Sequence, residues 1–168
     1  MASGGNGTSN HVSGELFKMM AGIDMLHVPY RGAAPALVDV LSGVCQVNFP
    51  AMPASIEYIK AGRLRALGVS TAMRSEALPG IPAVGEFLPG YESSSWWGVG
   101  APKNTPVEII EKLNREINAG LADPGMRAKL DPLGGTLIAG SPDDFRKLIV
   151  SETEKWAPVV RFSGAKPD

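Results

Sequence analysis

The sequence predicts an α/β fold with a parallel-rich sheet, and three observations support it. Short apolar segments bounded by glycine or proline recur at residues 25–30, 44–49 and 64–70, which is typical of buried strands. Apolar residues at helical spacing lie before and between these segments. The connections are only a few residues long. This rapid alternation favours parallel strands joined by crossover helices.

The expected helices end at glycines. Residues 9–21 carry apolar side chains at helical spacing, and Gly22 follows them as a stop. Residues 34–42 predict a second helix with one apolar face, also followed by a glycine. Residues 52–62 predict a third helix, with a proline in its first turn and a glycine at its C-cap. Because no strand is apparent before the first helix, the chain reads as if it began inside a fold.

Beyond residue 70 the pattern changes. Residues 71–94 are rich in proline and glycine without a period and predict a long ordered loop. Residues 96–102 predict another strand. We therefore expect an α/β ligand-binding lobe over residues 1–95, and a crossing strand with a mainly helical extension over residues 96–168.

Capping patterns introduce the helices of that extension. Thr105 and Ser141 are each followed by a proline and, three positions after the cap, by an acidic residue. A long amphipathic helix is expected after each cap. A short helix that includes Pro124 and a short strand at residues 136–140 are expected between them.

Composition excludes several classes of function. The 168 residues have a net charge of −1 and no long basic run, so nucleic-acid binding has no electrostatic support. No apolar run approaches the roughly 20 residues that span a bilayer. Cys45 is the single cysteine and only His11 and His27 accompany it, so we expect no zinc site, no other metal and no cofactor.

The first candidate site is the stretch GGNGTSNH, residues 4–11, at the entrance of the first helix. Glycines allow close backbone approach, and helix N-terminal amides attract negative charge, so the stretch is a candidate anion cradle. Thr8 and Ser9 add hydroxyl donors, and His11 in the first turn is a further candidate ligand-binding residue. The alternative is that Ser9 or Asn10 merely caps the helix. Both interpretations remain open at this level.

The second candidate site is VPYRGAAPALVD, residues 28–39, where a strand leads into the next helix. Ligands of open α/β sheets lie at the carboxyl ends of strands, beside helix N-termini. Tyr30 offers a hydroxyl and Arg31 a guanidinium that can pair with a carboxylate. A solvated Arg31 and a half-buried Tyr30 are the structural alternative. The convergence of two donor-bearing loops favours a binding site.

An enzyme is the competing class of function. The alternative would be a small α/β hydrolase or transferase domain that uses Ser9 and His11. On a helix these two residues diverge by about 200°, which keeps their side chains apart. No GxSxG motif is present, and we expect no catalytic residues.

His27 and Cys45 lie within predicted strands, where a structural role is expected. Of Trp96 and Trp97, which would face opposite sides of a strand, we expect one in the core and one lining a cleft.

Four segments resemble one family in order along the chain. They are GNGTSNHVSGELFKMMAGIDMLHVPYRGAAPALVDVLSG, YIKAGRLRALGVSTAMRSEALPGIPAVGE, PGYESSSWWGVGAP and KWAPVVRFSGAK. Together they resemble the Bug family, the periplasmic solute-binding receptors of tripartite tricarboxylate transporters. The resemblance implies a periplasmic-binding-protein-like fold of type II, with two lobes that close on a small carboxylate.

The resemblance also implies where this chain fits. Family members are about twice as long and carry an upstream signal peptide and first lobe, neither of which is apparent here. The chain is similar to the second lobe, with most of its first strand missing, plus the tail that returns to the first lobe. The carried-over ligand contacts are Asn6, Gly7, Thr8, Ser9, Tyr30, Arg31 and Gly32. Pro50 and Ala51 stand where family members often have Asp-Asn, which favours a more apolar acid.

The resulting expectation is a periplasmic, non-enzymatic receptor portion without cofactor. By the resemblance, its ligand would be a small carboxylate, either a dicarboxylate, a tricarboxylate or an acidic amino acid, and the charge of Arg31 favours a dicarboxylate or an acidic amino acid. Its macromolecular partners would be the membrane subunits of the transporter. The surface left by the absent lobe would also allow self-association.

Overall fold

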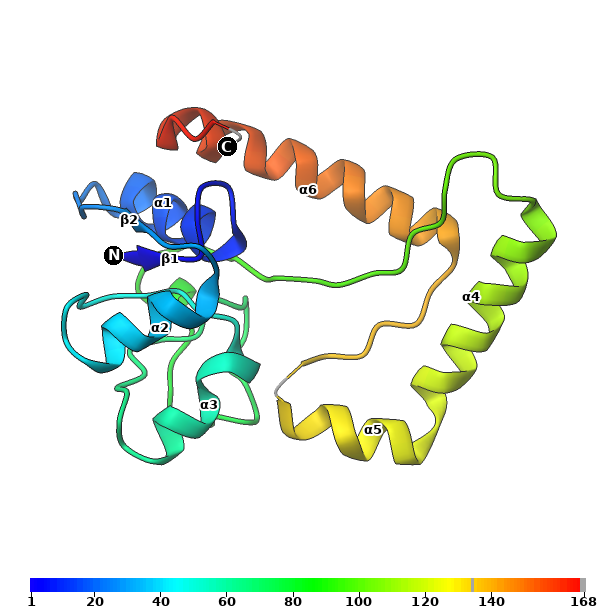
Figure 1. Ribbon diagram of the computed structural model, residues 1–168, viewed down its shortest axis with the longest axis horizontal. Helices are drawn as coiled ribbons and strands as arrows, with labels where there is room; N and C mark the ends of the chain where they lie inside the picture. Colours follow the sequence, from blue (N-terminus) through cyan, green and yellow to red (C-terminus); the bar gives the residue numbers. More distant parts are fainter. Residues whose placement is uncertain (134, 167–168) are drawn as a thin grey trace. The chain divides into compact units, whose positions relative to one another are not determined.

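The computed structural model describes residues 1–133 and 135–166 of the chain (Figure 1). The chain divides into two compact units. The first unit comprises residues 1–95 and the chain from Trp156 onward, and the second comprises residues 96–155.

The first unit is built on a two-stranded parallel sheet. Its elements in order are β1 (Ala2–Ser3), α1 (Ser9–Ala21), β2 (Val28–Pro29), α2 (Ala33–Leu41), α3 (Met52–Lys60) and the 3₁₀ turn η1 (Val84–Glu86). In register, Ala2 lies opposite Val28 and Ser3 opposite Pro29. Figure 1 shows β1 beside β2, with a loop leading from β1 into α1.

Helices α1 and α2 cover opposite faces of β1, because successive strand residues point to opposite sides. Ala2 is fully buried in a cluster with Ala36 of α2 and Cys45. Met1 points the other way: a Cβ added to Gly14 of α1 would lie 2.2 Å from the Met1 sulfur. A glycine at position 14 therefore lets α1 lie close against the strand.

A second cluster closes the α1 side of the first unit. Leu16, Tyr91 and Val159 are buried together, with Phe17 and Phe49 packed around them. The Tyr91 hydroxyl donates to the carbonyl of Ser13 at 3.1 Å. Because Val159 belongs to α6 (Pro142–Ser163), the end of that helix is part of this core. The first unit therefore contains the end of α6 in addition to residues 1–95.

The second unit contains the helices α4 (Val107–Ala122) and α5 (Pro124–Leu130), the turn η2 (Asp131–Leu133) and the start of α6. Asn114 and Asn118 of α4 both donate to the carbonyl of Gly140, at 2.8 and 3.0 Å. Trp96 packs edge-on against Phe145, with ring centroids 5.5 Å apart, but it is 38% exposed and Trp97 is 77% exposed, so the expectation that one of the two lies in the core is wrong.

The three helices expected in the first unit are observed within two residues of their expected bounds, and the three glycine stops take the left-handed conformation. Gly22 has φ 64° at the C-cap of α1, Gly43 has φ 83° two residues after α2, and Gly62 has φ 68° two residues after α3. The Ser141 cap is confirmed: its hydroxyl accepts from the Asp144 amide at 3.1 Å, and the Asp144 carboxylate accepts from the Ser141 amide at 3.0 Å.

Several expected strands are wrong. Residues 96–102 and 136–140 have no regular structure, and residues 44–49 and 64–70 make only isolated bridges, Ala2 with Asn48 and Val69 with Ala83. A strand needs consecutive paired residues, whereas residues 44–49 have only the two-residue β1 beside them and residues 64–70 form a single bridge, with Ala83. The expectation that no strand precedes the first helix was also wrong, because β1 does so.

The Thr105 cap is a further correction. The N-cap of α4 is Pro106, and the Thr105 hydroxyl donates to the carbonyl of Pro102 at 2.8 Å instead. Within the described residues, no helix combines the length and the apolar character that a membrane span requires.

Candidate functional site

The two loops that the sequence singles out touch each other in the structure. One follows β1 and the other follows β2, so both leave the same edge of the sheet. The amide of Tyr30 donates to the carbonyl of Ser3 at 3.0 Å, and the amide of Gly32 donates to the carbonyl of Gly4 at 3.0 Å. The parallel ladder is thus extended beyond the strands, and it fixes one loop against the other.

Glycine is required for this contact. A Cβ on Gly4 would lie 3.0 Å from the Ala33 nitrogen and 3.1 Å from the Gly32 carbonyl carbon. Gly5 has φ +124° and Gly7 φ +73°, conformations that side chains other than glycine rarely adopt. The loop of residues 4–8 can therefore follow this path only with glycines at these positions.

The three helices that follow the parallel segments begin without side-chain caps. The N-caps of α1, α2 and α3 are Thr8, Gly32 and Ala51, and none of them accepts a hydrogen bond from its helix through its side chain. The bridge between Ala2 and Asn48 places the segment before α3 beside β1. First-turn amides of a helix have no partner within the helix, and the helix dipole favours anions there. The edge is suited to bind negative charge.

The expected capping of α1 by Ser9 or Asn10 is wrong. Thr8 occupies the N-cap, and its hydroxyl donates to the carbonyl of Gly5 at 2.7 Å. Asn10 is buried, and its side-chain oxygen lies 3.4 Å from the Gly4 amide, which donates to it. Ser9 and Asn6 are exposed. Thr8 and Ser9 are the two expected hydroxyl donors. Among the described residues, the Thr8 hydroxyl already donates to Gly5, whereas the Ser9 hydroxyl donates to no group.

Tyr30 and Arg31 have opposite surroundings. The Tyr30 hydroxyl donates to the Asp39 carboxylate at 2.6 Å and lies 3.4 Å from the Cys45 sulfur. The hydrogen bond to Asp39 is the largest cause that raises the pKa of Tyr30, and the hydrogen bond to Cys45 is the next. This hydroxyl is therefore held inside the unit and is not the free donor that the sequence led us to expect. Arg31 is exposed and has no ion pair among the residues described.

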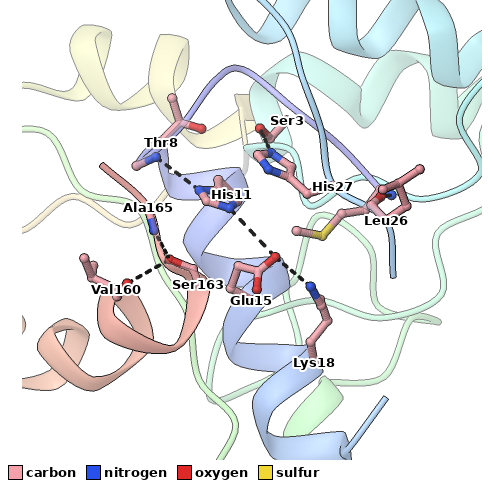
Figure 2. Close-up of polar contacts among 12 residues, drawn as sticks. Ser3, Thr8, His11, Glu15, Lys18, Leu26, His27, Val160, Ser163 and Ala165 are labelled. Atoms are coloured by element: carbon pink, nitrogen blue, oxygen red, sulfur yellow. Dashed lines mark hydrogen bonds and ion pairs between the residues drawn. The ribbon is translucent and has the colours of Figure 1, made fainter. Parts of the chain in front are cut away.

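His11 lies inside the unit (Figure 2). The side chain is 2% exposed, and its Nδ1 accepts the amide of Gly7 at 3.1 Å. The ring stacks on that of His27, with centroids 3.9 Å apart and planes inclined by 12°. Burial lowers the pKa of His11. The enzyme alternative gains nothing from this arrangement, because Ser9 is exposed while the His11 ring faces Gly7 and His27.

Two polar residues escaped the sequence reasoning. Glu15 is 3% exposed and pairs with Lys18 at 3.0 Å; its position four residues after His11 on the same helix was the available signal. Asn48 has both side-chain amide atoms buried without a hydrogen-bond partner in the described part of the chain. Its polar character inside the apolar segment VCQVNF was the corresponding signal.

The described residues lack the cluster of ligands that a metal site requires. Across residues 1–133 and 135–166, no group of three or more histidine, cysteine, aspartate or glutamate side chains could hold a metal ion. A hollow of about 360 Å³ lies in the second unit, lined by Leu113, Glu116, Ile117, Gly120, Leu121 and Met126. Because its lining is largely aliphatic, it is unsuited to a carboxylate.

Comparison with known proteins gives a consistent set of relatives. The model of the tripartite tricarboxylate transporter family receptor (TctC) matches residues 1–164. The chain is 40% identical over 161 residues to a UPF0065 protein in the tcbD-tcbE intergenic region of Pseudomonas sp. (strain P51). It is 38% identical over 161 residues to protein BugT of Bordetella pertussis. Each match covers 95% of this chain but 48% and 49% of the relative, so the chain spans about half their length.

Solved structures agree with this fold. R. palustris Rpa4515 with adipate superposes with a TM-score of 0.87 at 37% identity, covering 99% of this chain and 56% of that one. MatC from Rhodopseudomonas palustris with bound malate gives a TM-score of 0.79 at 26% identity, covering 95% and 55%. The periplasmic binding protein BugD gives a TM-score of 0.83 at 28% identity, covering 99% and 57%. The expected periplasmic-binding-protein-like α/β fold is confirmed, and the chain belongs to the Bug, or TctC, family of tripartite tricarboxylate transporter receptors.

Proposed function

We propose that this chain is the portion of a solute-binding receptor that holds a small dicarboxylate at the edge formed by residues 4–9 and 30–33. The observation that carries the proposal is the direct contact of the two loops that lead into the uncapped N-termini of α1 and α2. The similar structures contain adipate and malate, which are both dicarboxylates. A receptor of this family acts by binding, not by catalysis.

The contacts in the proposed site come mainly from the backbone. First-turn amides of α1 and α2 would hold one carboxylate, with the Ser9 hydroxyl beside them. Arg31 is exposed at the same edge and would attract the second carboxylate. Thr8 would join them only if its hydroxyl leaves the Gly5 carbonyl, so its contribution is smaller than that of Ser9.

The remaining parts of the proposal concern the whole receptor. The relatives are about twice as long, and we propose that their further half supplies the opposite wall of the site. The exposed apolar residues of α4, among them Ile109, Leu113 and Ile117, would face that half or, without it, a second copy of the chain. We place the receptor in the periplasm, delivering its ligand to membrane subunits of the transporter.

Calorimetric titration tests the ligand class. Adipate is compared with hexanoate, which lacks one carboxylate, and with adipamide, which lacks both charges. We expect binding in the order adipate, hexanoate, adipamide. Ser9→Ala should weaken adipate binding roughly tenfold, because a hydrogen bond to a charged group contributes about 1.5–3 kcal/mol.

Ser42→Ala is the matched control, because Ser42 is an exposed serine at the opposite end of α2. It should leave the affinity unchanged. The same titrations are repeated on a chain extended by the further half of the relatives. If neither version binds any of the acids, or if adipamide binds as well as adipate, the proposal is wrong.

A further inference from the structure

The amide of Gly7 lies in the middle of the proposed binding loop but is bound by a side chain of α1. It donates to Nδ1 of His11, which is 2% exposed. Gly7 itself is exposed and has φ +73°. The bond therefore ties an exposed turn to a buried ring, and it closes the loop directly before the first turn of α1.

This hydrogen bond requires one protonation state of His11. An imidazole nitrogen that accepts cannot carry a proton, so neutral His11 must hold its proton on Nε2. Nε2 faces the Glu15 carboxylate at 3.8 Å, and Glu15 is held by Lys18 at 3.0 Å. The carboxylate favours a proton on Nε2 and so leaves Nδ1 free to accept. Figure 2 shows the three side chains in this order along α1.

His27 fixes the ring from the other side. Its ring stacks on His11 with a centroid distance of 3.9 Å, and its Nε2 lies 2.6 Å from the hydroxyl of Ser3 in β1. The strand, the loop and α1 are thus joined through two imidazole rings. Of the two predicted roles, a structural role for His27 agrees with this geometry, whereas a ligand contact by His11 does not.

The surroundings keep both rings neutral near pH 7. The titratable and charged groups that face them are Glu15, Lys18 and the amino group of Met1. Burial is the largest cause that lowers the pKa of His11 below 6.5, with Glu15 opposing it and Lys18 adding to it. Burial and the neighbouring His11 lower the pKa of His27 to about 4.

We propose that His11 is a positioning residue of the receptor: through its unprotonated Nδ1 it holds the Gly7 amide and so fixes the loop that presents the first turn of α1 to the ligand. This inference rests on the proposed function for its effect on affinity, but its effect on the loop stands by itself. Acidification removes the acceptor, so the loop loses this support as the pH falls below 6.5 and through the folded-state pKa of His11.

The test distinguishes the role of His11 Nδ1 as a hydrogen-bond acceptor from the role of the side chain's size. Asparagine at position 11 places its oxygen near the position of Nδ1, whereas glutamine places its oxygen near that of Nε2. We expect His11→Asn to keep the protection of the Gly7 amide against hydrogen exchange within about threefold, and His11→Gln to lose roughly tenfold, the scale of one hydrogen bond with a buried partner left unsatisfied. Affinity for adipate should follow the same order.

A pH series on the unmodified chain needs no variant to fold. The NMR signals of the Gly7 amide and of the His11 ring nitrogens should titrate together, with a midpoint below 6.5. The core variant Leu16→Ala, on the same helix, should lower global stability without moving that midpoint. For binding, the adipate Kd of His11→Asn is divided by the Kd of the unmodified chain at each pH, so that the titration of adipate itself cancels. This ratio should fall as the pH falls, because only the unmodified chain loses its Nδ1 acceptor.

The outcomes distinguish this inference from the proposed function. If Gly7 and His11 titrate together but no carboxylate binds, the proposed function is wrong and the tie of Gly7 to His11 stands. If Gly7 does not titrate with His11, or if the asparagine and glutamine variants lose Gly7 protection equally, the positioning role is refuted whatever the ligand.

Discussion

Replacing Gly4 by alanine should separate the two loops at the proposed site. The added Cβ would lie 3.0 Å from the backbone nitrogen of Ala33 and 3.1 Å from the carbonyl carbon of Gly32. Ordinary contacts of this kind are longer by a few tenths of an ångström. Because both atoms belong to the backbone, no side-chain rotation relieves the clash, and the start of α2 must move away from residue 4.

The magnitude follows from what that movement breaks. The hydrogen bond from the Gly32 amide to the Gly4 carbonyl, 3.0 Å long, would lengthen or be lost, which costs about 1 kcal/mol. Overpacking adds about 1–3 kcal/mol. The two costs together, about 2–4 kcal/mol, lower Tm by roughly 4–16 °C for a protein of this size. If the movement of the first turn of α2 removes even one charge-assisted hydrogen bond to the ligand, adipate binding should weaken roughly tenfold.

Thermal unfolding followed by circular dichroism measures the first effect, and calorimetric titration with adipate measures the second. Gly80→Ala is the matched control, because a Cβ at Gly80 meets no atom within 4 Å and its φ lies outside the left-handed region. It should unfold within a degree or two of the unmodified chain. If Gly4→Ala behaves like Gly80→Ala in both measurements, the close contact of the loops is not needed, and the reasoning about the site fails.

Two further substitutions test other parts of the first unit. Asn48→Leu removes a buried amide that has no hydrogen-bond partner among the described residues, so urea unfolding should show a gain of about 1–3 kcal/mol; a loss would mean that the amide has a polar partner after all. Arg74 holds the carboxylate of Glu86 at 2.6 Å, and this bond, together with the Ala83 amide, lowers the pKa of Glu86 from 4.5 to about 2. The pair therefore stabilises the fold above pH 4.5 and loses this contribution as the pH falls towards 2, and Arg74→Ala should return the NMR titration midpoint of Glu86 towards 4.5. An unchanged midpoint in that variant would contradict the assignment.

The helices were predictable because their signals are local. Helical spacing and Gly22 predicted the bounds of α1, and Ser141 with Asp144 predicted the start of α6, since a capping box involves only residues three positions apart. The strands depended on partners elsewhere in the chain. Residues 44–49 have the composition of a strand, but only a two-residue β1 lies beside them, so a single bridge forms.

The sequence by itself also determined the α/β class, the family resemblance and the two donor-bearing loops. Only the tertiary structure decided what each donor does. The Tyr30 hydroxyl donates to Asp39, the Thr8 hydroxyl donates to Gly5, and His11 accepts the Gly7 amide. The physical reason is that a polar side chain binds whichever group the fold brings within about 3 Å, and those groups lie up to fifteen positions away or on another element. Residue type sets which bonds are possible, and packing selects among them.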